Sequence, residues 1–481
     1  AGPRQAASRD PLLSMIGMPS PQHHHSLIAL GLGLALGLSL PHVLRLRRRR
    51  GLGGSSAGTV KAGLTDTRAV RLPRRVLTDF LAACLTAAGA APAHAAQAAD
   101  VLAYADSRGI PSHGANRADT YANEIEAKLV DGVASPVVER SSGCTAVIDG
   151  RNALGAVVCN LAMETALRLA KEHGVGVVAA RNSNHFGAAG YWANQALSAG
   201  MIGLSFTNTA PFAAATGGCT RAVGVGPSCC PAHARANQAT TDECAWGRHQ
   251  PALLLRARRR GHRRHARNEA RPSLCHQSGA HAAGDSFQLD MATTVVPVGK
   301  VEVMHRIGQR IPAGWAVDRS GRDTTDPAEV VQHGALHPLG GGEETAGYKG
   351  YGLGMLVEML SAVLPGCADV GPAVQPWTLS RERPNGYGHC FVVLDPKRFT
   401  PGFGGRLREY LAAMRCLPGA VRCPGDPEKA YEEEARARGV VLHEGTATAL
   451  KALAGRYGVE TPPEFAALDA SRSKPSLYAQ A

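Results

Sequence analysis

The chain has 481 residues, of which 52 are Lys or Arg and 39 are Asp or Glu, so its formal net charge is +13. With 44% hydrophobic and 19% charged residues, the composition excludes a chain that is disordered throughout, and the length allows two substantial cores. The positive charge lies in two segments: residues 1–75 carry a net +10 and residues 226–284 carry +7, which leaves −4 elsewhere. A basic protein would ordinarily suggest nucleic acid as a partner, but the body of this chain is mildly acidic.

Residues 1–73 form a basic leader that we interpret as a targeting segment, a disordered segment or an upstream translated region. SLIALGLGLALGLSLPHVL at 26–44 is nearly uncharged and just long enough to span a bilayer. Its glycines and Pro41 make a poor helix, and its Arg cluster follows the apolar stretch, whereas a secretory signal carries its charge before it. We therefore favour a leader over a membrane anchor, and we expect the protein in the cytoplasm or an organelle matrix.

Helical and strand patterns alternate over residues 74–225. They predict helices at 76–89 and 93–109, a strand at 144–150, a helix at 155–173, a strand at 174–181, a helix at 188–200 and a strand at 201–209. Such alternation indicates an α/β protein in which helices cover strands. We interpret this region as a helical N-terminal part followed by the substrate-binding and catalytic part.

A Ser-His-Gly sequence at 112–114 follows the second predicted helix, and Arg117 comes shortly after it. Histidine suits proton transfer near neutral pH, and the planar fork of arginine can hold a carboxylate through two hydrogen bonds. Together they would serve a small acid whose neighbouring oxygen gains or loses a proton. The structural alternative is that His113 caps a helix and Arg117 forms a surface ion pair.

The strand predicted at 174–181 runs into Asn-Ser-Asn-His, and the next helix then opens with small residues. Polar groups between a strand end and a helix N-terminus make a natural anion pocket. Here the alternative is a capping arrangement in which Ser183 or Asn184 holds the start of the helix and His185 merely fills space.

Residues 226–284 interrupt the pattern. The segment has ten Arg and three acidic residues, no apolar period, and Trp246 as its single aromatic residue. We interpret it as an atypical Arg-rich insertion that arises from a retained intron or a shifted reading frame, because long structureless loops are uncommon inside compact domains.

The alternation of helical and strand patterns resumes after the insertion. It predicts a strand within 286–296, a Gly-rich turn that opens a helix at 347–364, a strand at 389–395, and helices at 403–416, 427–438 and 446–457. We assign 285–395 to cofactor binding, 396–470 to C-terminal helices and 471–481 to a tail.

In this order the motifs resemble the malate/L-lactate dehydrogenase family of NAD(P)-dependent oxidoreductases, most closely its members that act on malate. The resemblance covers about residues 74–470. It rests on RGIPSHGANR at 108–117, NSNHFGAAGYWA at 182–193, SFTNTAP at 205–211, DSFQLDMATTVVPVGKVEV at 285–303, IPAGWAVDRSGRDTTDP at 311–327, PLGGGEETAGYKGYGL at 338–353 and RCPGDPE at 422–428.

The resemblance implies a distinctive α/β fold, not a Rossmann fold, with helices packed on mixed sheets. It implies that His113 exchanges the proton, that Arg117 holds the substrate carboxylate, and that Ser112 and His185 line the pocket. It assigns NAD, or NADP as the alternative, to Leu289, Asp290, Met291, Ala292, Thr293, Thr294, Tyr348, Lys349, Gly425, Asp426 and Pro427. The family has a strand where the insertion stands, so that strand is expected to be missing or displaced.

We therefore expect a homodimeric, NAD-dependent enzyme that interconverts malate and oxaloacetate, or a related pair of 2-hydroxy and 2-oxo acids, without a metal. Neither nucleic acid nor a membrane is expected as a partner. The alternative is a catalytically impaired relative or scaffold whose Arg-rich insertion binds nucleic acid.

Overall fold

The computed structural model describes residues 69–224, 228–233, 285–306, 308–375, 382–466 and residue 468. All of them lie in one compact unit of the chain, residues 63–481. The leader segment at 26–44, with its expected targeting or membrane role, lies outside the described residues. Within the described part, no helix is both long and apolar enough to cross a bilayer.

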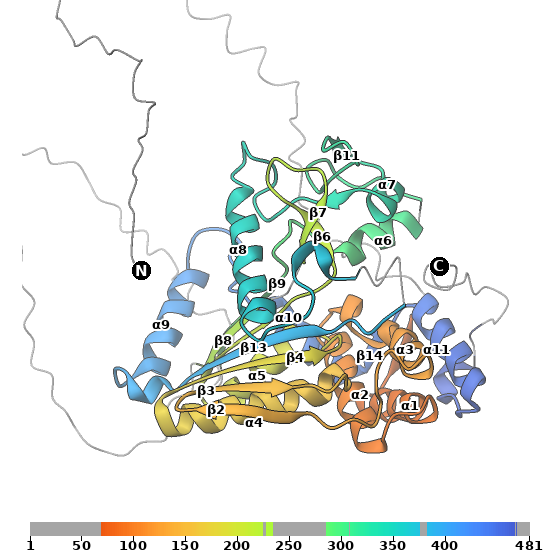
Figure 1. The fold of residues 1–481 in the computed structure, drawn as a ribbon, viewed down its shortest axis with the longest axis horizontal. Coiled ribbons are helices and arrows are strands. Elements are labelled where there is room, and N and C mark those ends of the chain that lie inside the picture. The colour runs from red at the N-terminus through yellow and green to blue at the C-terminus, as the bar shows by residue number, and fades with distance from the viewer. Residues whose placement is uncertain are drawn as a thin grey trace, which may run out of the picture. The chain divides into compact units, whose positions relative to one another are not determined.

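A seven-stranded mixed sheet organises the protein, and the predicted α/β class is confirmed (Figure 1). Strands β3 and β4 are parallel, whereas β13 lies between β4 and β5 and is antiparallel to both. In spatial order the strands are β2 (Val137–Ser142), β3 (Thr145–Asp149), β4 (Val175–Ser183), β13 (Tyr387–Leu394), β5 (Ile202–Thr207), β8 (Ser228–His233) and β9 (Ser286–Met291).

Helix α4 (Gly155–His173) packs on β4 and leads directly into it. The helix ends at Gly174, whose φ of +87° is the left-handed conformation that glycine adopts most easily. Close packing on the strand depends on Gly176, because a Cβ there would lie 2.2 Å from the carbonyl oxygen of Ala166. This tight α4–β4 unit fixes where the C-terminal end of β4 lies, and that end carries the Asn-Ser-Asn-His sequence.

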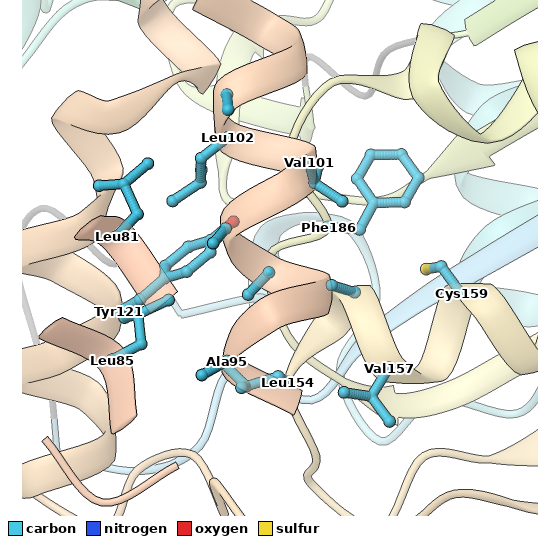
Figure 2. Close-up of a cluster of buried hydrophobic side chains, with 14 of the residues drawn as sticks. Leu81, Leu85, Ala95, Val101, Leu102, Tyr121, Leu154, Val157, Cys159 and Phe186 are labelled. Atoms are coloured by element: carbon cyan, nitrogen blue, oxygen red, sulfur yellow. The ribbon is translucent and has the colours of Figure 1, made fainter. Parts of the chain in front are cut away.

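Helices from both ends of the chain form the main hydrophobic core together with α4 and α5 (Ala189–Ser198). Figure 2 shows part of this core, in which Leu81, Leu85, Leu102 and Tyr121 lie close together. Strand β1 (Val70–Leu72) pairs with β14 (Val440–Leu442) and so joins the two ends. The helices are α1 (Arg74–Ala87), α2 (Pro92–Ser107), α3 (Ala118–Glu126), α10 (Asp426–Arg438) and α11 (Glu444–Tyr457).

A second, five-stranded sheet has its own small core around Phe212, Val301, Ile311 and Leu336. Its order is β11 (Asp323–Thr324), β10 (Ala316–Val317), β12 (Ala335–Leu336), β6 (Pro211–Ala214) and β7 (Arg221–Gly224). The remaining helices are α6 (Val298–Arg306), α7 (Pro327–Gln332), α8 (Tyr348–Glu358), which continues as a π-helix over Met359–Val363, and α9 (Phe403–Arg415).

The start of the Arg-rich insertion takes part in the large sheet. Strand β8 pairs with β5 on one side and with β9 on the other, both antiparallel. The strand was expected to be missing or displaced; it is not missing, because residues 228–233 form a strand at this place of the sheet. The rest of the insertion, residues 226–227 and 234–284, lies outside the described residues.

Candidate active site

The Ser-His-Gly loop joins α2 to α3 through two short 3₁₀ turns, Pro111–His113 and Ala115–Arg117. A carboxylate from the end of α2 holds this loop, because Asp106 accepts a 2.6 Å hydrogen bond from the backbone N–H of Ala115. Burial raises the pKa of Asp106 to about 7. The loop passes so close to this carboxyl group that a Cβ on Gly114 would lie 2.1 Å from its Oδ1 atom.

His113 lies partly buried within this loop, where its Nδ1 atom is 2.9 Å from Oγ of Ser112. Burial, with a smaller contribution from the positive charge of Arg117, lowers the pKa of His113 to about 4. The imidazole is therefore neutral near pH 7 and able to accept a proton. Ser112 also lies close to α6, since its Cβ is 3.2 Å from the position that a Cβ on Gly299 would occupy.

Arg117 is only 8% exposed, so the alternative of a surface ion pair does not describe it. Its Nε atom donates a 2.8 Å hydrogen bond to the carbonyl oxygen of Ser112, which orients the guanidinium group along the loop. No side chain caps α3, so His113 does not have the capping role of the structural alternative either.

His185 comes two residues after the end of β4 and stacks on His113, with ring centroids 5.6 Å apart and planes inclined by 21°. Its Nδ1 atom is 2.7 Å from the hydroxyl of Tyr121. The capping alternative for this segment is wrong, because α5 begins after Ala188 without a side-chain cap. The two histidines lie on a small cavity of about 20 Å³, which is lined by His113, His185, Phe186, Gly187, Thr207, Asn208, Thr209 and Tyr387.

A buried histidine that the sequence reasoning missed stabilises the same region. His389 on β13 is fully buried, and its two ring nitrogens lie 2.8 Å from the hydroxyls of Thr207 and Ser183. Its ring stacks on Phe186 at 4.8 Å, and burial lowers its pKa to about 3. His389, on β13, is thus linked to Ser183 on β4 and to Thr207 on β5. It supports Phe186, the residue that follows His185. The sequence feature that could have revealed this role is a single histidine in an otherwise apolar strand.

The predicted cofactor residues around β9 connect to the same loop. Leu289, Asp290 and Met291 are the last residues of β9, and Asp290 accepts a 2.9 Å hydrogen bond from the backbone N–H of Gly190 in the first turn of α5. Burial raises the pKa of Asp290 to about 6. The end of β9 is thus held beside the segment that carries His185.

After β9 and Ala292, two threonines differ in their surroundings. The Thr294 hydroxyl donates a 2.8 Å hydrogen bond to the carbonyl oxygen of Val296, which is a structural role. Thr293 is 1% exposed, and its hydroxyl has no hydrogen-bond partner among the described residues. A Cβ on Gly354 of α8 would lie 3.4 Å from that hydroxyl oxygen. A buried, unpaired hydroxyl beside a glycine fits a polar group of a ligand, such as the carboxamide of a nicotinamide.

The other predicted cofactor residues divide into two sets. Tyr348 and Lys349 lie exposed in the first turn of α8, whose Gly350 packs against the backbone of Leu339. Leu339 in turn donates its N–H to the carbonyl oxygen of Thr293 at 2.9 Å, so these residues and the β9 segment are brought together.

Gly425, Asp426 and Pro427 approach β9 from the C-terminal helices. Gly425 has a φ of +95°, and a Cβ on it would lie 2.8 Å from the Cβ of Gln288 in β9. Asp426 is paired with Arg415 at 2.6 Å and accepts a hydrogen bond from the backbone of Cys423. Its carboxylate thus already has structural partners, whereas Gly425 brings the chain close to the strand.

The sequence profile of the malate/L-lactate dehydrogenase family matches residues 72–263 and 278–451. The chain belongs to this family.

Its relatives act on different acids. The chain is 36% identical over 340 residues to a malate dehydrogenase of Pyrococcus horikoshii, covering 70% of this chain and 80% of the relative. It is 34% identical over 301 residues to an L-sulfolactate dehydrogenase of Methanocaldococcus jannaschii, covering 63% and 71%. The solved malate dehydrogenase structure from Pyrococcus horikoshii superposes with a TM-score of 0.66 at 32% identity, covering 82% of this chain and 98% of that one. The fold is therefore that of the family, and the chain is a dehydrogenase of 2-hydroxy acids that uses a nicotinamide cofactor.

Proposed function

We propose that the protein is an NAD-dependent oxidoreductase that interconverts malate and oxaloacetate, or a closely related pair of acids. The observation that carries the proposal is the stacking of His113 on His185 at a small cavity, beside the buried cation of Arg117. A neutral imidazole next to a fixed guanidinium suits a substrate with a carboxylate and an adjacent oxygen that exchanges a proton. The family assignment favours this enzyme over the alternative of a nucleic-acid-binding scaffold.

In the oxidation direction, Arg117 holds the C1 carboxylate of the 2-hydroxy acid and thereby fixes the position of C2. His113 takes the proton of the C2 hydroxyl on its free ring nitrogen while Ser112 stays beside Nδ1. The C2–H bond breaks with its electron pair, and the C2–O bond becomes a carbonyl. In the reverse direction the same imidazole returns the proton to the oxygen. The low pKa of His113 keeps it in the neutral, accepting form before oxidation begins.

The bound nicotinamide would supply the chemistry of accepting and returning the hydride of C2. Thr293, with its unpaired buried hydroxyl, and the exposed first turn of α8 would hold this group, with Asp290 beside them. We propose NAD as the cofactor, with NADP as the alternative.

We further propose a homodimer. The exposed side of α8 and its π-helical continuation carries an apolar stripe, in which Met355, Met359 and Val363 are 51%, 48% and 58% exposed. Such a stripe is typical of a covered interface. Sedimentation at micromolar concentration, with Met359→Glu as the dissociating variant, tests the assembly; a monomeric native chain would contradict it.

The direct test of the function follows NADH absorbance with a panel of 2-oxo acids, among them oxaloacetate, pyruvate and 3-sulfopyruvate, and repeats the series with NADPH. Oxaloacetate is expected to give the highest kcat/KM. His113→Ala should lower kcat by about a hundredfold or more while NADH binding persists. Unchanged turnover would remove His113 from the mechanism, and absence of turnover with every acid would overturn the proposed function.

A further inference from the structure

The Nδ1 atom of His185 lies between two hydrogen-bond donors. The backbone N–H of Gly187 points at it from 3.3 Å, with the amide nitrogen as the donor. The hydroxyl of Tyr121 lies 2.7 Å from the same atom and 3.2 Å from the carbonyl oxygen of His185. A backbone amide can only donate, so its geometry constrains which ring nitrogen carries the proton.

Only one neutral tautomer satisfies both contacts. If Nδ1 carried the proton, that N–H would face the N–H of Gly187, and the hydroxyl of Tyr121 would have to turn to the longer contact with the carbonyl. If Nδ1 is unprotonated, its lone pair accepts from both donors, and the proton resides on Nε2. The arrangement around His185 therefore favours the Nε2–H form.

Tyr121 is well placed to impose this choice, because its ring is fixed. The side chain is 5% exposed and lies among Leu81, Leu85 and Leu102 of the main core (Figure 2). Burial raises the pKa of Tyr121 far above its ordinary value, so the hydroxyl keeps its proton at every working pH. A rigid ring with a permanent O–H is a reliable donor.

The other ring nitrogen faces a different environment. The ring of His185 lines the cavity with His113, and no protein atom of the described residues accepts a hydrogen bond from its Nε2. The titratable and charged groups around it are His113 and Arg117 on the loop, Tyr121 on α3 and His389 on β13. Burial first, and then the charges of His113, Arg117 and His389, lower the pKa of His185 well below its ordinary value, so the ring stays neutral.

We infer that Tyr121 is a positioning residue, which together with the Gly187 amide holds His185 as a hydrogen-bond donor through Nε2 to the 2-oxygen of the substrate. His113 and His185 then have opposite roles, since the first exchanges a proton and the second stabilises negative charge that develops on the oxygen. A fixed N–H donor in a dry site stabilises such charge without becoming charged itself. This inference rests on the proposed function, because that function supplies the oxygen.

The first experiment needs no turnover. ¹⁵N-histidine-labelled protein is examined by NMR, and His185→Gln assigns the His185 signals by their disappearance. We expect a proton on Nε2 in the native chain and a mixture of tautomers in Tyr121→Phe. A native His185 protonated on Nδ1 would overturn the inference, even in a chain that proves fully active.

The second experiment separates positioning from folding. Tyr121→Phe is expected to lower kcat about tenfold with little change in KM, and the matched variant Tyr191→Phe, which loses a hydroxyl contact to Asp100 outside the site, should keep native kcat. His185→Gln presents an amide donor near the place of Nε2, whereas His185→Asn presents one near Nδ1. We therefore expect Gln to retain more kcat than Asn; equal losses, or an unaffected Tyr121→Phe, would overturn the inference. A native chain inactive with all acids would instead refute the proposed function and leave the NMR result standing.

Discussion

The carboxylate of Asp106 and the backbone N–H of Ala115 are joined by a 2.6 Å hydrogen bond across the Ser-His-Gly loop. This one contact ties the last turn of α2 to the turn that carries Arg117, so His113 is presented from a loop held at both ends. Because the same carboxyl group is buried, the stability of the loop depends on whether Asp106 is protonated.

Asp106→Asn should change how stability depends on pH. The folded-state pKa of Asp106 is raised by burial from 3.8 to about 7, so the folded chain binds the extra proton between these values. The stability from this group is full below pH 3.8 and is lost as the pH rises to about 7. Asparagine does not titrate, so relative to native protein the variant should gain about 1–3 kcal/mol between pH 5 and pH 8. Urea unfolding of both proteins across this pH range measures the difference in their free energies of unfolding. A difference that does not change with pH would contradict the prediction.

Gly114→Ala should distort the loop, because the new Cβ would lie 2.1–2.4 Å from the atoms of the Asp106 carboxyl group. We expect a loss of about 1–3 kcal/mol in the free energy of unfolding and a lower kcat/KM. Gly455→Ala in α11, where a Cβ meets nothing within 4 Å, is the matched control and should be neutral or stabilising. The cost of Gly114→Ala should shrink in an Asp106→Ala background; equal costs in both backgrounds would mean that the carboxyl group is not the obstacle.

Thr293→Val tests the unpaired hydroxyl. Removing a buried polar atom that has no protein partner should raise the stability of the cofactor-free chain by up to about 1 kcal/mol. The same change should reduce the rise in Tm that saturating NADH produces, because a ligand contact is lost. Thr294→Val, which removes a 2.8 Å hydrogen bond to Val296, should instead destabilise the cofactor-free chain. An undiminished NADH effect in Thr293→Val would separate this hydroxyl from the cofactor.

Arg117→Lys should raise KM for the 2-oxo acid about tenfold or more, because a point charge replaces the planar fork. The change also removes the Nε hydrogen bond to Ser112, so part of the loss reflects the loop. Comparing the acid with its neutral amide separates the two effects, since only the acid has a carboxylate to lose. If both substrates suffer equally, Arg117 supports the loop and does not bind the carboxylate.

Local patterns predicted the large elements well, because each has a periodic face and a clear end. The helix predicted at 155–173 has those bounds in the structure, and Gly174 terminates it immediately before β4. The strand predicted at 389–395 is β13, although its place between β4 and β5 could not be read from a single segment. Pairing between distant strands depends on contacts that sequence periodicity does not encode.

The candidate site could also be predicted only in part from the sequence. Residue type and motif singled out His113, Arg117 and His185, and the structure brings them together. The sequence reasoning missed Tyr121 and His389, which act through contacts with residues far away in the chain. The short strands β10, β11 and β12 of the second sheet were not predicted either, because each has only two residues and shows no alternating pattern.

The place of β13 affects how this protein can be made. Strands β4 and β5 leave the ribosome long before Tyr387, so during synthesis each exposes the edge that β13 later covers. Uncovered edges invite pairing with other nascent chains. A chain truncated before residue 387 would therefore be an aggregation-prone fragment and not a smaller enzyme. The last fifth of the chain is needed to cover the strand edges that the earlier part exposes.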